Sequence, residues 1–200
     1  MGLTQEYTPG QTPINEDESD GLKILTITTQ GELNEFEQHN IEHAMLWLKS
    51  QKPSAQQLLS ENFIKKLHTK MYGDVWKWAG KFRKSEKNLG IQHHLIETEL
   101  KKLMDDTLYW IAHSTYSPDE IAIRFKHRLV SIHCFPNGNG RHSRIMADLI
   151  VEKIFGLPHF NWGKSTLTEN DGVRDAYLRA LREADLFNYQ PLILFARGDH

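Results

Sequence analysis

Apolar residues recur three and four positions apart along most of this chain of 200 residues. That spacing places them on one face of an α-helix, which can then be buried against its neighbours. Capping signals support two of the helix starts: Ser117 precedes Pro118 with Glu120 three residues on, and Thr168 precedes an apolar run that includes Val173. The pattern predicts an all-α fold, with helices over about 34–49, 59–71, 96–112, 118–133 and 168–184.

Three segments break the helical pattern. Residues 1–20 are rich in Thr, Pro, Gly and acidic residues, so we expect a flexible or surface-draped arm there. Residues 22–28 are apolar and β-branched enough for a short extended segment, and residues 72–95 carry three glycines that favour a loop or hairpin. Residues 21–200 are expected to form one domain, because this length suits a single core.

Composition narrows the class of protein. A formal charge of −2 argues against a generic nucleic-acid binder, which would carry a basic excess. The single cysteine, Cys134, cannot form an internal disulfide, and no run approaches the ~20 apolar residues of a membrane span. The polar first twenty residues do not have the apolar core of a signal peptide. We therefore expect a cytoplasmic protein without direct membrane or nucleic-acid partners.

The segment from His133 to Arg144, His-Cys-Phe-Pro-Asn-Gly-Asn-Gly-Arg-His-Ser-Arg, concentrates the chemistry of the chain. His133 is the side chain whose usual pKa suits proton abstraction near neutral pH. Gly138 and Gly140 let the backbone turn sharply and approach a ligand. A helix that begins at Asn139 or Gly140 would aim its unpaired amides into the loop, where phosphate binds well, and two arginines three positions apart would extend from one face of it. The segment therefore predicts phosphate chemistry.

This segment resembles the signature of Fic-domain proteins, His-x-Phe-x-Asp/Glu-Gly-Asn-Gly-Arg-x-x-Arg, and departs from it only at Asn137. Within that family it is similar to the group called mobile mystery protein B. Softer similarity to that group covers most of the chain, including Glu32 to Asn34, Trp78 to Arg83 and Tyr177 to Ala184.

The resemblance implies an all-helical domain that binds ATP and Mg²⁺ and transfers AMP to a Ser, Thr or Tyr hydroxyl of a target protein. His133 would act as general base, and catalysis would rest mainly on positioning and charge neutralisation. Because an amide oxygen is a weaker Mg²⁺ ligand than a carboxylate, Asn137 implies weak metal affinity or a donor other than ATP. The expected nucleotide-site residues are Phe135, Gly138, Asn139, Gly140, Arg141 and Arg144, with Phe135 as a core anchor.

Fic proteins also carry a β-hairpin flap beside the motif, and the resemblance implies one here. The flap would hold the target backbone over the active site, although a plain surface loop is an equally good reading. A solvated loop face explains the basic residues around it, including Arg83, as well as a functional role does. The candidate flap residues are Lys84, Ser85, Glu86, Lys87, Asn88, Leu89, Gly90 and Ile91.

A partial match to the inhibitory helix of many Fic proteins lies near the N-terminus. Thr28 and Glu32 fit its Ser/Thr-x-x-x-Glu pattern, while Leu33 stands where Gly or Asn is usual. The hypothesis is that Glu32 pairs with Arg144 and restrains the enzyme. The alternative is an ordinary first-turn glutamate that the helix dipole favours.

Two other classes of function remain open. The first is a Fic scaffold with little catalysis, which binds a helix-turn-helix regulator in a pairing like that of a toxin and its antitoxin; the group it resembles suggests such a partner. The second is a zinc peptidase, because His39, Glu42 and His43 fit His-x-x-Glu-His on one helix. Eleven histidines make chance pairs common, and solvated helix residues explain these three better.

Overall fold

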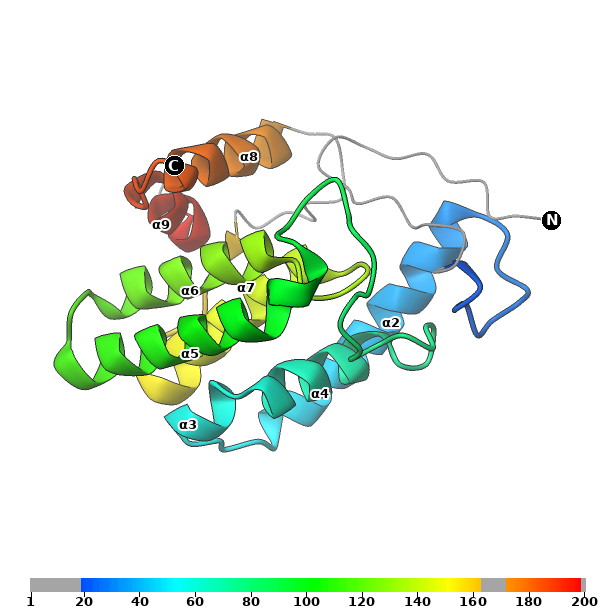
Figure 1. Cartoon of the computed structure of the whole chain (residues 1–200), viewed down its shortest axis with the longest axis horizontal. Helices are drawn as coiled ribbons and strands as arrows, with labels where there is room; N and C mark the ends of the chain where they lie inside the picture. The colour runs from blue at the N-terminus through cyan, green and yellow to red at the C-terminus, as the bar shows by residue number, and fades with distance from the viewer. Residues whose placement is uncertain (1–18, 163–171, 199–200) are drawn as a thin grey trace.

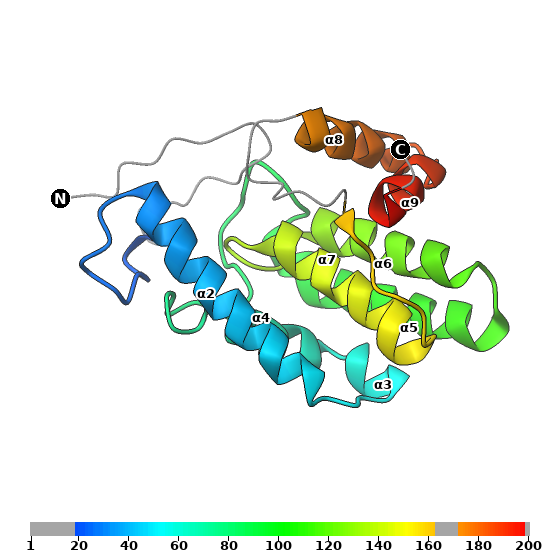
Figure 2. The ribbon, with the colours of Figure 1, turned by 180° about the vertical axis from the view of Figure 1, so that it is seen from behind.

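The protein is an all-helical assembly in a computed structural model that describes residues 19–162 and 172–198 (Figures 1 and 2). No strand occurs in these residues, which confirms the predicted fold class. Across the same residues, every helix is too short or too polar to cross a membrane. The helices are α2 (Gln30–Lys49), α3 (Ala55–Leu58), α4 (Glu61–Tyr72), α5 (Ile96–His113), α6 (Pro118–Ile132), α7 (Asn139–Leu149), α8 (Gly172–Asp185) and α9 (Gln190–Arg197), with a 3₁₀ turn, η1 (His93–Leu95), and a π-helical turn, η2 (Ile150–Ile154).

Helix α6 is the central element of the fold. It packs against α5, α7 and α9, and residues along it, such as Ile121, Phe125 and Leu129, are buried in the core. Helices α2 and α4 form a second layer that reaches the bundle through α7, while α8 and α9 pair with each other at the other side of α6 (Figure 1). The loop between α6 and α7 therefore lies where these layers meet.

Local sequence signals explain most of the helix boundaries. Ser117 caps α6 as predicted, since its side chain accepts a hydrogen bond from the Glu120 amide. The helix predicted over about 59–71 is present as α4, which begins after Ser60 because the Ser60 side chain accepts a hydrogen bond from the Phe63 amide; the short α3 precedes it. The expected cap at Thr168 lies outside the described residues, although the helix that follows is present as α8.

Two predictions about the N-terminal region are wrong. The extended segment expected over 22–28 is interrupted by a turn, in which the Ile27 amide donates to the Ile24 carbonyl, and an isolated antiparallel bridge joins Leu22 to Trp76. The helical spacing over 34–49 counts Phe36 and Met45 among its apolar positions and so predicts that they are buried, but both are exposed in α2. Polar Glu37 is buried on α2 instead, because its carboxylate accepts a hydrogen bond from the Trp76 indole. Most of the predicted arm, residues 1–18, lies outside the described part of the chain.

Candidate active site in the loop between α6 and α7

His133 closes α6 and opens the loop that leads to α7. Its φ of 57° lies in the left-handed region, and its amide donates to the Leu129 carbonyl at 3.3 Å. Gly138, with φ of 78°, caps the first turn of α7, which begins at Asn139 as predicted. The candidate base therefore lies at the C-terminus of one helix, and the N-terminus of the next helix follows within the same short loop.

Asn139 and Phe135 hold the loop closed from within. The Asn139 Oδ1 accepts from the Phe135 amide at 2.9 Å, and its Nδ2 donates to the Phe135 carbonyl at 2.8 Å. Both residues are buried, and the Phe135 ring stacks on His68 with centroids 3.7 Å apart. The side chains of Asn139 and Phe135, both expected at the nucleotide site, thus fix the shape of the loop between α6 and α7 through contacts within the protein.

His68, on α4, is a residue that the sequence analysis missed. Its Nε2 lies 3.0 Å from the Asn137 carbonyl, and its Nδ1 accepts from the Gly80 amide at 3.0 Å. Burial holds its pKa well below the usual range, so the ring is neutral and Nε2 carries the proton. The available signal was its place on the buried face of α4, next to Leu67.

The two glycines of the loop have different surroundings. A Cβ on Gly138 would lie 2.5 Å from the Tyr72 ring, so this position needs glycine for both packing and its positive φ. A Cβ on Gly140 would meet nothing within 4 Å. The protein packing therefore does not require glycine at 140, and the open space beside the first turn of α7 suits a group that approaches the backbone.

Arg141 is held by a buried carboxylate from α2. Its Nη2 donates to Glu37 Oε2 at 2.5 Å, and the other oxygen of Glu37 accepts from the Trp76 indole at 2.7 Å. The guanidinium also lies over the Tyr72 ring, 5.1 Å from its centroid. Burial alone would lower the pKa of Arg141, but Tyr72 and Glu37 outweigh that effect and raise it, so the guanidinium stays charged. Glu37 is a second residue that the sequence analysis missed.

Arg144 lies one turn further along α7, in a region rich in positive charge. It makes no ion pair with the residues that the structure describes. Its guanidinium carbon lies 5.8 Å from the centre of the Tyr177 ring, and the buried Lys126 ammonium lies 4.6 Å from the same ring. Burial lowers the pKa of both cations. The two arginines therefore differ, because Arg141 is neutralised by Glu37 and Arg144 is the better counter-charge for an anion.

His133 is neutral at physiological pH. Burial, followed by the positive charges of Arg83 and Lys87, lowers its pKa to about 4. A neutral imidazole can accept a proton, as a general base must, although a base of such low pKa is weak until an anion arrives beside it. Cys134 and His142 are also buried: the Cys134 thiol has a pKa raised to about 12, and His142 Nε2 donates to the Ile64 carbonyl at 3.1 Å.

Arg83 is buried, which corrects the expectation of a solvated basic face. Its Nε donates to the His133 carbonyl at 2.6 Å, and its Nη1 donates to the Ser85 carbonyl at 2.9 Å. Its Nη2 donates to the Ile91 carbonyl. One guanidinium therefore ties both ends of the segment 84–91 to the turn that carries His133.

The predicted β-hairpin flap is not formed, because residues 84–91 contain no strand. The carbonyls near the two ends of this segment accept hydrogen bonds from Arg83, whereas in a hairpin they would pair with the opposite strand. The loop nevertheless lies against the site. A Cβ on Gly90, whose φ is 99°, would be 2.5 Å from the Cβ of His133.

The inhibitory pair between Glu32 and Arg144 is absent. Glu32 Oε2 accepts from the Thr28 amide at 2.8 Å and the Thr29 amide at 3.1 Å, within a capping box at the start of α2. These hydrogen bonds lower the Glu32 pKa. The residue is therefore the ordinary first-turn glutamate of the alternative interpretation, and the hypothesis of restraint by Glu32 is wrong for this structure.

Asn137 is a weak candidate ligand for Mg²⁺. Its Oδ1 accepts from the Gly138 amide at 2.6 Å, and the side-chain amide is neutral, so this oxygen would attract a cation less than a carboxylate would. A magnesium role for Asn137 stays a prediction.

The zinc-peptidase pattern is likewise incomplete. The His39 and His43 rings lie 4.3 Å apart, but Glu42 accepts from Gln38, and no third ligand joins them among the described residues.

Comparison with known proteins agrees with this geometry. Residues 58–151 match the sequence model of the Fic/DOC family. Fic-1 (residues 134–508) from C. elegans has a similar fold, with 23% identity and a TM-score of 0.64, over 79% of this chain and 46% of that one. The chain therefore spans about half the length of that protein.

Two bacterial structures cover the chain more evenly. BepC from Bartonella tribocorum, a VirB-translocated effector with bound AMPPNP, is 17% identical with a TM-score of 0.67 and matches 92% of this chain and 97% of its own. An N-terminal Fic domain from Bartonella quintana with bound ADP is 18% identical with a TM-score of 0.67, over 86% of each chain. Residues 58–151, a little under half of the chain, therefore match the Fic/DOC family model, and the chain shares the fold of the solved Fic structures.

Proposed function

We propose that the protein is a nucleotidyltransferase that moves AMP from ATP to a Ser, Thr or Tyr hydroxyl of a target protein. The observation that carries the proposal is the neutral His133 imidazole at the end of α6, in the same loop as the N-terminus of α7 and its two arginines. Members of the Fic/DOC family are typically AMP transferases or related transferases. Bound AMPPNP and ADP in two similar Fic structures support a nucleotide ligand.

The proposed reaction transfers AMP from ATP to the target hydroxyl and releases pyrophosphate. His133 takes the proton of the target hydroxyl while its oxygen attacks the α-phosphorus of ATP. A phosphodiester bond forms, the bond between the α- and β-phosphates breaks, and pyrophosphate leaves. The first amides of α7 face the phosphates, and Arg144 neutralises charge on the leaving group. Arg141 contributes less, because Glu37 already neutralises it.

Metal enters this proposal only through the nucleotide. Mg²⁺ neutralises phosphate charge when bound, and here the phosphates themselves would have to supply most of its ligands. Weak metal dependence from the protein side is the expected consequence of Asn137.

A Fic-scaffold protein with little catalysis is the second candidate, and Asn137 is the residue that favours it. Its partner would be a helix-turn-helix regulator, as the resemblance to mobile mystery protein B suggests. Nucleotide binding without transfer distinguishes this candidate from the first.

The test is incubation of the full chain with Mg²⁺ or Mn²⁺ and each labelled nucleoside triphosphate, with cell lysate as the source of targets. We expect label on a protein from the wild type and a loss of about 10²–10⁴-fold in His133→Ala, with nucleotide binding retained. His113→Ala, at the exposed end of α5, is the matched control and should not change transfer. Equal labelling by His133→Ala would refute the mechanism, and nucleotide binding without labelling by the wild type would favour the binding protein.

A further inference from the structure

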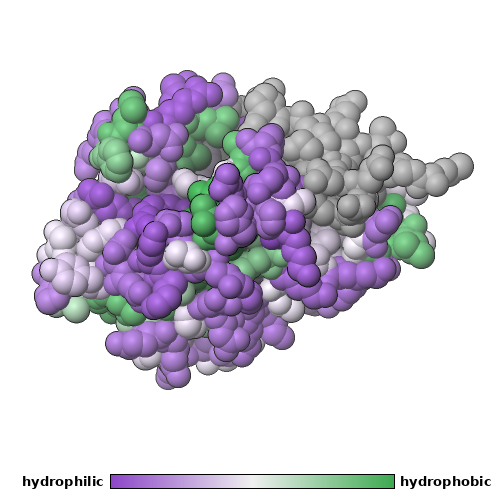
Figure 3. Space-filling model, viewed as in Figure 1, coloured by the Kyte–Doolittle hydropathy of each residue, from purple (hydrophilic) through white to green (hydrophobic). Residues whose placement is uncertain are grey.

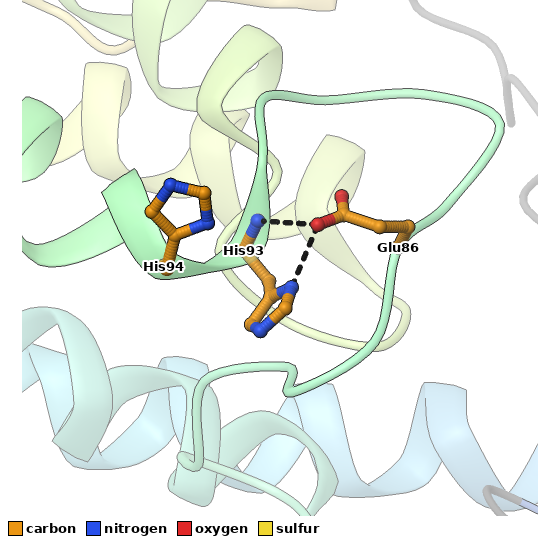
Figure 4. Close-up of side chains that lie close together, drawn as sticks. All are labelled: Glu86, His93 and His94. Carbon is orange, nitrogen blue, oxygen red and sulfur yellow. Dashed lines mark hydrogen bonds and ion pairs between the residues drawn. The ribbon is translucent and has the colours of Figure 1, made fainter.

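Three potential metal ligands meet at the edge of the loop beside the active site. Glu86 lies in the segment 84–91, and His93 and His94 form η1 at the start of α5 (Figure 4). The Glu86 Oε1 accepts from the His93 amide at 3.2 Å and lies 2.7 Å from His93 Nδ1. The carboxylate thus faces the His93 ring across the loop, and the His94 ring lies beside it, perpendicular to His93, with centroids 5.8 Å apart.

We propose that Glu86, His93 and His94 form a binding site for a divalent transition-metal ion, with Zn²⁺ as the best match. One ligand atom from each residue lies within 4.8 Å of the other two. Two imidazole nitrogens and one carboxylate oxygen are ligands that Zn²⁺ accepts, and three protein ligands leave a fourth position for water. Mg²⁺ prefers an all-oxygen shell, so it should bind poorly here.

Only small movements are needed to close the site. At metal–ligand bonds near 2.1 Å, tetrahedral ligand atoms lie about 3.4 Å apart. The Glu86 and His93 atoms are closer than this and would separate as the ion enters between them, while His94 would approach. The side chains of Glu86 and His93 are 57% and 39% exposed, so packing does not oppose these rotations.

The charges around the cluster set its strength. Arg83 Nη1 lies 3.6 Å from the second Glu86 oxygen and opposes a cation, whereas the Glu86 carboxylate itself attracts one. This balance predicts moderate affinity. The other candidate pair, His39 and His43, has two rings but no third ligand among the described residues, so it should bind such an ion more weakly.

The position of the site gives it a consequence. An ion held by Glu86 and the two histidines would tie the middle of the loop to the start of α5. The loop packs against the Cβ of His133 at Gly90, so a bound ion would stiffen the backbone beside that residue. Metal binding itself does not depend on the proposed transfer reaction.

The test is a calorimetric titration of the tag-free, chelator-treated full chain with Zn²⁺, and with Co²⁺ followed by its visible absorption. We expect a single ion to bind, and Glu86→Gln and His94→Ala each to weaken Zn²⁺ binding by more than about 100-fold, since even outer-shell partners of a metal are worth about 10–100-fold. Glu97→Gln and His43→Ala are the matched controls and should retain the site. All four side chains are exposed, and thermal melts would verify that the variants fold.

Protection of the loop 84–91 from proteolysis by bound Zn²⁺ provides a second measurement. Zn²⁺ should slow proteolytic cleavage within 84–91 in the wild type and should not do so in His94→Ala. The proposal is overturned if no ion binds at micromolar concentration, if His43→Ala removes binding while His94→Ala does not, or if Mg²⁺ binds as tightly as Zn²⁺.

Discussion

Replacing Arg83 with methionine isolates the contribution of its guanidinium. Methionine keeps most of the apolar stem and removes every donor, so the carbonyls of His133, Ser85 and Ile91 lose a charged partner at once. Because the Arg83 side chain is fully buried, water cannot replace it without opening the loop.

The expected cost follows from these contacts. A hydrogen bond to a charged group contributes ~1.5–3 kcal/mol, and a buried acceptor left unsatisfied costs ~1–3 kcal/mol. The charge itself is expensive to bury, which offsets part of this gain. We therefore expect Arg83→Met to lower the free energy of unfolding by ~2–4 kcal/mol, a large part of the ~5–15 kcal/mol that holds a typical domain folded.

Urea unfolding followed by far-ultraviolet circular dichroism would measure this loss. Lys84→Met is the matched control, since Lys84 is the exposed neighbour and its replacement should be nearly neutral. If Arg83→Met unfolds within ~0.5 kcal/mol of the wild type, the guanidinium does not hold the loop and the reasoning fails.

Two further predictions concern a buried acid and the glycines. Asp148 on α7 accepts hydrogen bonds from the Phe160 amide and the Trp162 indole. Burial nevertheless raises its pKa from 3.8 to about 7. The contribution of Asp148 to stability is therefore fully present below pH 3.8 and is lost as the pH rises through about 7. Asp148→Asn should therefore unfold at a higher temperature than the wild type at about pH 8 and lose that advantage near pH 4. Gly90→Ala should destabilise the protein by ~1–3 kcal/mol in the same urea assay, through its positive φ and its contact with His133, whereas Gly140→Ala should preserve stability and weaken nucleotide binding in calorimetry. Equal unfolding of Gly90→Ala and Gly140→Ala would contradict the packing argument, and a pH-independent difference for Asp148→Asn would contradict the titration argument.

The helices were predictable because their signals are local. The apolar spacing and the Ser117 cap predict α6, and the glycines of the loop predict the start of α7. The order of base, loop and arginines also follows from the sequence, since all of them lie within one short segment.

The partners of that segment were not predictable, because they come from distant parts of the chain. Glu37 precedes Arg141 by 104 positions and His68 precedes Asn137 by 69, and a single sequence contains no signal that joins them. Arg83 was misjudged for a related reason. A basic residue among lysines indicates a solvated surface in the sequence, and only the structure shows the main-chain carbonyls that surround the Arg83 guanidinium.

The contact between Glu37 and Arg141 also limits how the molecule can be divided. Glu37 belongs to α2 and Tyr177 to α8, so both lie outside the matched segment 58–151. A fragment cut at those limits would contain the whole signature and still lack the carboxylate that holds one arginine and the aromatic ring beside the other. The recognisable unit of sequence is therefore smaller than the unit that can assemble the site, and deletion studies should keep α2 and α8 with the motif.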